Sequence, residues 1–168
     1  PVYVKSAFYE YLDTGYAAFK NATQSRAPTV YVGSNDGMLH AFNAENGTER
    51  WAYIPKMVIP KLMMLADKTY SNNHRFFVDG PTSVSDVYFG GAWHTILIGT
   101  LGKGGRGIFA IDVTDPNAPK ALWNYSADEN PNVGYQYGAP IITKLNPDNM
   151  SAADKAKLSD PAHPWVVI

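Results

Sequence analysis

TVYVGSNDGMLHAFNAENGTERWAYIP, residues 29–55, decides the fold because it contains three short apolar runs separated by two tight turns. The turns are Asn35-Asp36-Gly37 and Glu45-Asn46-Gly47, and these residue types tolerate the positive φ angles of hairpin turns. The stretch therefore predicts strands at 29–33, 38–43 and 48–54, joined as an antiparallel meander.

A second copy of this unit follows in the chain. TILIG at 95–99 corresponds to TVYVG, and IFAIDV at 108–113 corresponds to the return strand. The third strand of the copy is expected at 121–125 and again carries a tryptophan. Gly33 thus corresponds to Gly99, Ala41 to Ala110 and Trp51 to Trp123, and the two copies differ only in turn length.

One further strand precedes each unit, which makes each unit a four-stranded antiparallel meander. These strands are expected at 1–5 and 82–89, and a third unit begins with strands at 139–145 and 164–168. An internal repeat of this kind is typical of a β-propeller, whereas a β-sandwich explains the strands but not the repeat. The inner strands are apolar on both faces, as stacked blades require.

The expected architecture is an all-β, quinoprotein-like propeller, present as a sector of about two and a half blades. Its boundaries are blade 1 at about 1–54, a helical insertion at about 55–75, blade 2 at about 76–127 and the start of blade 3 at about 134–168. Short helices are expected at 15–22, from Pro60 onward and at 152–158. In the second helix, Val58, Leu62 and Leu65 fall on one face, which is expected to pack on the propeller edge.

Composition excludes several classes of protein. The 168 residues contain no cysteine, so disulfides and thiolate metal sites are absent from this chain. The net charge of −1 gives no electrostatic reason for a nucleic-acid partner. No apolar run is long enough to cross a bilayer as a helix, so no membrane span is expected. The first residue is Pro1 and the last strand reaches Ile168, from which we expect an internal piece of a longer polypeptide.

The motif Ala41-x-Asn43-x-x-x-Gly47-x-x-x-Trp51 resembles the tryptophan-docking motif of pyrroloquinoline-quinone dehydrogenases, which has Asp where Asn43 stands. Its role is structural. A large ring from one blade fills the gap against the next blade, and its N–H is expected to find a backbone acceptor.

Gly102-x-Gly104-x-x-Gly107 matches the dinucleotide-binding fingerprint by letter only. A strand, IFAIDV, follows it, where phosphate binding needs a helix N-terminus. We therefore interpret it as a glycine-rich hairpin turn. The histidines show no metal-ligand spacing, and structural roles are expected for them; they are His40, His74, His94 and His163.

Hard oxygen donors cluster at Asp112-Val113-Thr114-Asp115-Pro116-Asn117 and could hold Ca²⁺. The same residue types form turns through side-chain-to-backbone bonds, and this interpretation is favoured here. Asn35-Asp36 and Asp79-Gly80 are likewise interpreted as turn-formers. No catalytic, cofactor-binding or metal-binding residue is assigned in this segment.

Four stretches together resemble the type IV pilus-associated PilC/PilY family, and more narrowly its C-terminal β-propeller domain. They are VYVGSNDGMLHAF (30–42), HRFFVDG (74–80), YFGGAWHTILIGTLGKGGRGIFAIDVTDP (88–116) and GYQYGAP (134–140). The resemblance covers nearly the whole chain in order and spacing. Its structural signature comprises Gly33, Asn35, Asp36, Gly37, Trp51, Asp79, Gly80, Gly102, Gly105, Asp112 and Trp123.

The resemblance implies a secreted bacterial protein at the cell surface, outer membrane or pilus tip. Its members associate with minor pilins, support pilus assembly against retraction, and serve twitching motility and adhesion to host-cell or abiotic surfaces. Some carry a calcium loop of the form D-x-D-x-D-x-x-x-D. No such run occurs in residues 1–168, so no cofactor is assigned to this segment, and a calcium loop, if the protein has one, is expected in the downstream blades.

A non-enzymatic adhesin and pilus-assembly module is thus the favoured function. A pyrroloquinoline-quinone-type dehydrogenase propeller is the alternative, although many such enzymes stack the cofactor on a vicinal disulfide and this chain has no cysteine. A scaffold propeller of outer-membrane assembly is a further alternative. The insertions at 6–27, 56–75 and 146–164 are the candidate contact surfaces, and a packed-edge role is at least as well supported for the middle one.

Overall fold

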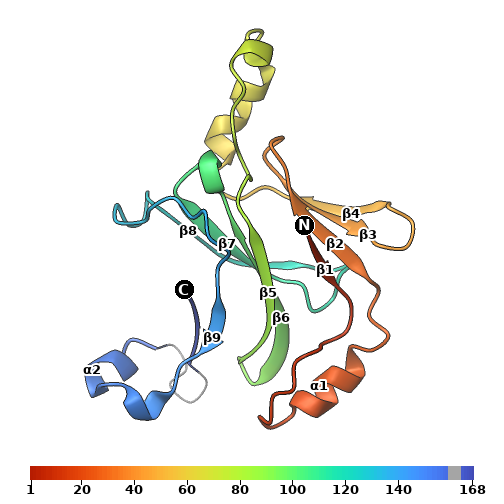
Figure 1. Ribbon diagram of the computed structural model, residues 1–168, viewed down its shortest axis with the longest axis vertical. Coiled ribbons are helices and arrows are strands. Elements are labelled where there is room, and N and C mark those ends of the chain that lie inside the picture. The colour runs from red at the N-terminus through yellow and green to blue at the C-terminus, as the bar shows by residue number, and fades with distance from the viewer. Residues whose placement is uncertain (159–163) are drawn as a thin grey trace.

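The computed structural model describes residues 1–158 and 164–168 and contains two four-stranded antiparallel sheets (Figure 1). Each sheet is a simple meander, in the orders β1-β2-β3-β4 and β5-β6-β7-β8, and β9 pairs with β10 in a third sheet. The predicted all-β class is therefore confirmed. The strands are β1 Val2–Val4, β2 Thr29–Gly33, β3 Leu39–Asn43, β4 Glu49–Tyr53, β5 Thr82–Phe89, β6 Ala92–Thr100, β7 Gly107–Asp112, β8 Lys120–Ser126, β9 Ile142–Lys144 and β10 Trp165–Val167.

The strand β6 begins earlier than the sequence pattern predicts. Phe89 pairs with Ala92 across a tight hairpin, and the ladder continues to Thr82 opposite Gly99. The turn is made by Gly90 and Gly91, whose φ angles of 60° and 87° suit glycine. Because this turn is so short, residues 92–94 pair with β5 rather than forming a loop.

The internal repeat reappears in the strand register. Ala41 lies opposite Trp51 in the first sheet, and Ala110 lies opposite Trp123 in the second. Each sheet also has a register shift directly after this alanine, at Ala41/Phe42 and Ala110/Ile111. The repeat predicted from the sequence is therefore a repeat of backbone geometry as well.

The main core lies between the two large sheets. Tyr31 and Leu39 from the first sheet and Leu97 and Phe109 from the second are fully buried there. A second cluster lies on the other face of β5–β7, where Ile96, Ile98 and Ala110 pack toward β9 and β10. The inner strands of the second sheet are thus buried on both faces, as the sequence predicts for stacked blades.

Helices are short and connect or flank the sheets. The helix α1 (Tyr16–Ala22) confirms the prediction for 15–22, and α2 (Ala152–Lys155) is shorter than the predicted 152–158. There are also three short 3₁₀ turns: η2 Tyr70–Asn72, η3 Gly102–Gly104 and η4 Pro147–Asn149.

The helix expected from Pro60 onward is a 3₁₀ helix, η1 (Ile59–Ala66). Its backbone bonds span three residues, as from the Lys61 N–H to the Val58 carbonyl oxygen. The predicted face is nevertheless correct, because Val58, Leu62 and Leu65 all pack with the main core. In the described part of the chain, no helix has the length and apolarity needed to cross a membrane.

Candidate functional surface

Trp51 joins the two large sheets. Its indole Nε1 donates a hydrogen bond to the carbonyl oxygen of Pro116, 2.8 Å away in the β7–β8 turn. Its ring also packs on the main core beside Tyr31, with ring centroids 5.6 Å apart. This is the backbone acceptor in a neighbouring blade that the docking motif predicts.

Two further side-chain contacts hold β4 against the second sheet. Arg50 Nη1 donates to Asn117 Oδ1 at 2.7 Å, and the Asn124 side chain bonds the Tyr53 hydroxyl at 2.9 Å. Asn124 Oδ1 also accepts from the Lys56 backbone N–H at 3.1 Å. These contacts fix the sheets relative to one another, so segments that leave them start from a rigid base.

Most of the signature residues meet at one junction, where segment 77–80 runs between the β2–β3 turn and the β6–β7 loop. These backbone segments approach one another so closely that only glycine fits at the contact points. A Cβ on Gly33 would lie 2.5 Å from the Val78 carbonyl oxygen, and one on Gly80 would lie 2.0 Å from Thr100 Oγ1. Gly102, at φ 52°, would meet Gly80 at 2.9 Å.

The Asn35 side chain forms hydrogen bonds across this junction. Its Oδ1 accepts from the Phe77 N–H at 3.0 Å, and its Nδ2 lies 3.5 Å from Asp79 Oδ1. Val78 N–H donates to the Ser34 carbonyl oxygen at 3.2 Å. The sequence pattern identified Asn35 as a local turn-former, but its contacts reach 42 residues along the chain.

Of the other turn residues at the junction, Asp36 acts locally, as predicted, while Gly37 and Gly105 lie against η1. Asp36 Oδ1 accepts from the Met38 N–H at 3.0 Å, which closes the β2–β3 turn. Gly37 has φ 98°, and a Cβ there would meet Leu62 of η1 at 2.4 Å. Gly105 lies in the β6–β7 loop, where a Cβ would be 3.1 Å from Lys61 Nζ. That loop joins two antiparallel strands, so the glycine-rich hairpin turn is confirmed.

Three signature residues lie away from this junction: Trp51, described above, and Trp123 and Asp112. Trp123 is 39% exposed and faces a groove of about 770 Å³ between the second sheet and β9–β10. Asp112 is buried at the end of β7, where its Oδ2 lies 2.8 Å from His94 Nδ1. Trp123 and Asp112 therefore lie outside the junction, and the described contacts give them no common hydrogen-bonding partner.

The oxygen donors proposed for Ca²⁺ at 112–117 serve other partners. Asp112 Oδ1 accepts from Thr114 N–H and Oγ1 at 2.9 and 2.6 Å, and Asp115 Oδ1 accepts from the Asn117 N–H at 2.9 Å. The turn interpretation is therefore supported by the contacts. Across residues 1–158 and 164–168, no group of three or more histidine and carboxylate side chains is arranged to hold a metal ion.

The described histidines take structural positions. His40 Nε2 lies 2.9 Å from Asp36 Oδ2 and its Nδ1 lies 2.6 Å from Glu49 Oε1. Burial alone would lower the pKa of His40, but the hydrogen bonds to Glu49 and Asp36 outweigh it and raise the pKa. His74 contacts the rings of Tyr70 and Phe76, while His163 lies outside the described residues.

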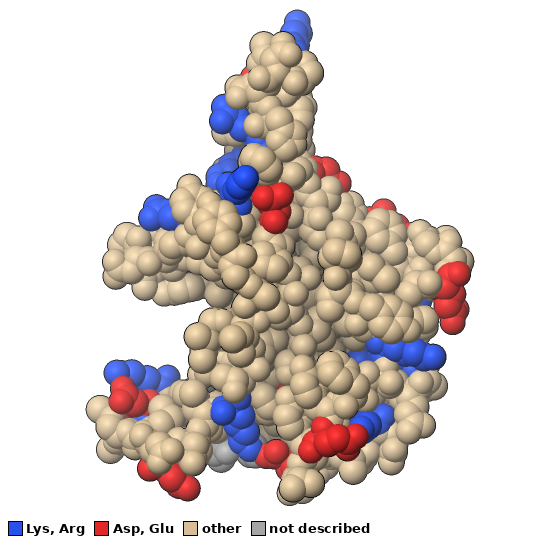
Figure 2. All heavy atoms as spheres, in the orientation of Figure 1, with Lys and Arg blue, Asp and Glu red and all other residues tan. Residues whose placement is uncertain are grey.

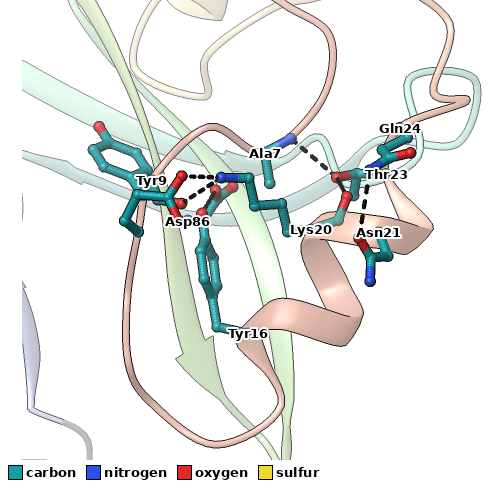
Figure 3. Close-up of polar contacts among 9 residues, drawn as sticks. Ala7, Tyr9, Tyr16, Lys20, Asn21, Thr23, Gln24 and Asp86 are labelled. Atoms are coloured by element: carbon teal, nitrogen blue, oxygen red, sulfur yellow. Dashed lines mark hydrogen bonds and ion pairs between the residues drawn. The ribbon is translucent and has the colours of Figure 1, made fainter.

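The insertion at 6–27 is packed onto the second sheet through buried polar contacts (Figure 3). Tyr16 on α1 donates its hydroxyl to Asp86 Oδ2 at 2.7 Å, and Thr95 Oγ1 donates to Asp86 Oδ1 at 2.7 Å. Arg26 is buried and donates from Nη1 to Thr95 Oγ1 at 2.7 Å. Burial and the Asp86 carboxylate raise the pKa of Tyr16 well above its ordinary value, which keeps the phenol protonated.

The insertion at 146–164 is described only in part, because residues 159–163 lie outside the described residues. The side chains at the N-cap positions of η4 and α2 cap these two short helices. Asn146 Oδ1 accepts from the Asp148 N–H at 2.9 Å, and Ser151 Oγ accepts from the Asp154 N–H at 3.1 Å. These bonds are local to η4 and α2, and the role of this insertion as a contact surface stays a prediction.

The insertion predicted at 56–75 projects from the sheets, and we call residues 56–76 the finger (Figure 1). Its two ends are fixed, since Val58 at one end and Phe77 directly after the other are fully buried. Between them, Ile59, Met63 and Met64 are exposed. The packed-edge expectation therefore holds for one face of the finger, and the other face is free to make contacts.

Sequence reasoning missed two features of this region. Phe77 and Val78 belong to the main core, although they read only as part of the HRFFVDG stretch. Their apolar pair beside two turn-type residues is the signal that could have identified a buried anchor. The Asp86–Thr95–Arg26 network gave no such signal, because its members lie on separate segments that only the fold brings together.

The chain is similar to known proteins in sequence and in structure. The family model for the PilY1 beta-propeller domain matches residues 2–156. Curated relatives include the type IV pilus biogenesis factor PilY1 of Pseudomonas aeruginosa strain UCBPP-PA14, 49% identical over 132 residues, which are 78% of this chain and 11% of that protein. A PilY1 homolog of Xylella fastidiosa is 41% identical over 134 residues, covering 79% of this chain and 11% of the relative.

A solved structure agrees with these matches. The crystal structure of the Pseudomonas aeruginosa PilY1 C-terminal domain superposes with a TM-score of 0.74 at 37% identity and covers 99% of this chain and 30% of that chain. The chain spans about a tenth of the length of the curated relatives it matches. The similarity thus extends over nearly all of this chain and a small part of each relative.

Proposed function

The chain belongs to the PilY1 β-propeller domain family, and from this membership we propose that it serves as a non-enzymatic part of a type IV pilus biogenesis factor. The match over residues 2–156 is the observation that carries the proposal. The relatives are named for pilus biogenesis, which is a role in assembly rather than in catalysis.

In this proposal the propeller sector displays surface segments to other pilus components, with minor pilins as the expected partners. The contacts of Trp51, Tyr53 and Arg50 with the second sheet support it, because they fix the scaffold from which the finger projects. A rigid scaffold with projecting loops lowers the entropy lost when a partner binds. Exposure on the cell surface or pilus tip, attachment, twitching motility and support of assembly against retraction belong to the same proposal.

The test is deletion of the gene that encodes the complete polypeptide, followed by complementation. We expect the deletion strain to lose most surface pili, by electron microscopy and by immunoblot of sheared pilin, and to recover them with the wild-type gene. An additional deletion of the retraction ATPase separates assembly from retraction, and recovery of pili in that double mutant would place the role in opposing retraction. Unchanged pilus number in the single deletion strain would refute the proposal.

A further inference from the structure

The finger and its base concentrate positive charge on a chain whose net charge is −1. Residues 56–76 contain four lysine and arginine residues and one carboxylate, Asp67. Two more cations lie at the base on the β6–β7 loop. In the space-filling view, blue atoms follow the projecting finger down to its base (Figure 2). The six cations are Lys56, Lys61, Lys68, Arg75, Lys103 and Arg106.

The cations of the base are held in place by the fold without being neutralised. Lys61 Nζ donates to the Gly104 carbonyl oxygen at 3.0 Å, and Lys103 lies 5.1 Å from the ring centroid of Phe76. Arg106 donates to the Pro131 carbonyl oxygen at 3.3 Å. The ion pairs of the described residues involve none of the six cations. Lys56 and Arg75 do help to lower the pKa values of Glu129 and Asp67, so the cations that face no such carboxylate are Lys61, Lys68, Lys103 and Arg106.

Apolar side chains are exposed on the same finger. Met63 is 80% exposed and Ile59 is 56% exposed, while Met64 and Phe76 are each at least 40% exposed. The finger packs on the core through Leu62 and Leu65 instead. Methionine adapts to the shape of a partner and is common on binding surfaces.

A pocket at the base adds a defined position for an anionic group. It has a volume of about 190 Å³, and both Lys61 and Arg106 line it together with Ser126, Tyr135 and one carboxylate, Asp128. The two cations can hold a carboxylate by charge-assisted hydrogen bonds, whereas the Ser126 hydroxyl already donates to Glu129 Oε2. The pocket therefore fits one acidic side chain, with the finger above it.

We propose that the finger and this pocket bind an acidic, partly apolar segment of a partner protein, with one carboxylate seated between Lys61 and Arg106. The inference rests on the proposed function, because it names the surface that a pilus partner would contact. A protein fits better than a membrane. The pocket is recessed, the core fixes the finger at both ends, and the finger lacks the tryptophans that mark membrane interfaces.

The test uses the complete polypeptide and a fluorescein-labelled peptide of Glu, Leu and Ser, with a matched peptide that has Gln in place of Glu. We expect binding of the Glu peptide in 50 mM salt, at least tenfold weaker binding in 300 mM salt, and little binding of the Gln peptide. Equal binding of both peptides, or preferential binding to phosphatidylglycerol vesicles, would overturn the inference.

Variants locate the site. K61Q/R106Q and K68E/R75E should each weaken binding of the Glu peptide at least fivefold, since they remove the pocket cations and the finger cations respectively. K5E/K120E has the same charge change as K68E/R75E at two exposed lysines away from the finger, and should stay within twofold of wild type. Equal loss in K68E/R75E and K5E/K120E would reduce the effect to net charge and refute the site.

The same variants in the complemented deletion strain separate this inference from the proposed function. Fewer surface pili with K68E/R75E than with K5E/K120E, at equal protein abundance, supports the finger as the contact surface. If every variant restores pili while the deletion strain has none, the pilus function stands and the inference fails.

Discussion

Trp51 on β4 and Pro116 in the turn after β7 are joined across two sheets by a 2.8 Å hydrogen bond, although 65 residues separate them in sequence. The donor is the indole N–H and the acceptor is a backbone carbonyl, so the bond does not depend on the side chain at position 116. The same tryptophan also packs on the main core. One residue thus supplies packing and orientation at the sheet interface.

Replacement of Trp51 by phenylalanine should therefore weaken that interface. The ring is kept in reduced size, but the Pro116 carbonyl oxygen loses its donor, so we expect a loss of about 1–2 kcal/mol in the free energy of unfolding. Chemical denaturation of the complete polypeptide measures it. Y3F removes a polar atom from a ring that is 59% exposed and should leave stability unchanged. Equal stability of W51F and Y3F would contradict the interface role.

Removal of the Tyr16 hydroxyl should destabilise the packing of α1. Asp86 is 2% exposed, and Y16F would leave its buried carboxylate with Thr95 as the remaining side-chain donor. Hydrogen bonds to charged groups contribute about 1.5–3 kcal/mol, and we expect a loss in this range. Thermal unfolding and hydrogen exchange of residues 16–22 report it. Y137F, at a ring that is 63% exposed, is the control and should match wild type in both measurements.

The contribution of His40 to stability should depend on pH. Its folded-state pKa is raised, which means that the protonated ring is favoured in the folded chain beside Glu49 and Asp36. Its stabilisation is therefore fully present below the unfolded pKa of about 6.5 and is lost as the pH rises through the folded pKa. H40Q should cost stability at pH 5.5 and much less at pH 8.5.

The measurement for His40 is the unfolding midpoint of wild type and H40Q at both pH values. H74Q is the matched control, because the described contacts of His74 are to aromatic rings and not to carboxylates. A difference between wild type and H40Q that grows from pH 5.5 to pH 8.5 would show that the sign is wrong.

An added methyl group at Gly80 should disrupt the junction below the finger. Its Cβ would lie 2.0 Å from Thr100 Oγ1 and 2.6 Å from the Gly102 backbone nitrogen, so backbone must move. We expect G80A to lose about 1–3 kcal/mol or more through overpacking. G134A adds the same methyl group in open space and should be neutral. Limited proteolysis within the finger should also accelerate in G80A alone, and equal cleavage of the two variants would argue against the junction.

The strands and their order could be predicted because local signals agree along this chain. Asn35-Asp36-Gly37 identifies a turn, apolar runs flank it, and the second copy at 95–125 repeats the alternation of apolar runs and turns. Trp51 could be assigned a backbone acceptor from its motif, although not the identity of Pro116. Each of these inferences depends on residues within a few positions of one another or on the repeat.

The junction and the finger could not be predicted in the same way. Gly33, Gly80 and Gly102 look like separate turn glycines in sequence, and only the fold shows that they make room for neighbouring backbone. The 3₁₀ geometry of η1 could not be predicted from residue type, because Leu and Met are good α-helix formers. The pocket beside Lys61 depends on the β6–β7 loop, which is distant in sequence.

Each end of the finger is held by both large sheets, and this has a mechanical consequence. At one end the Lys56 N–H donates to Asn124 of the second sheet and Val58 packs beside Gly37 of the first. At the other end the Phe77 N–H donates to Asn35 of the first sheet, and Phe77 lies against Gly104 in a loop of the second. Tension applied to the tip would divide between the sheets. A filament that pulls on this segment would therefore load many bonds at once, and the attachment would yield as a unit.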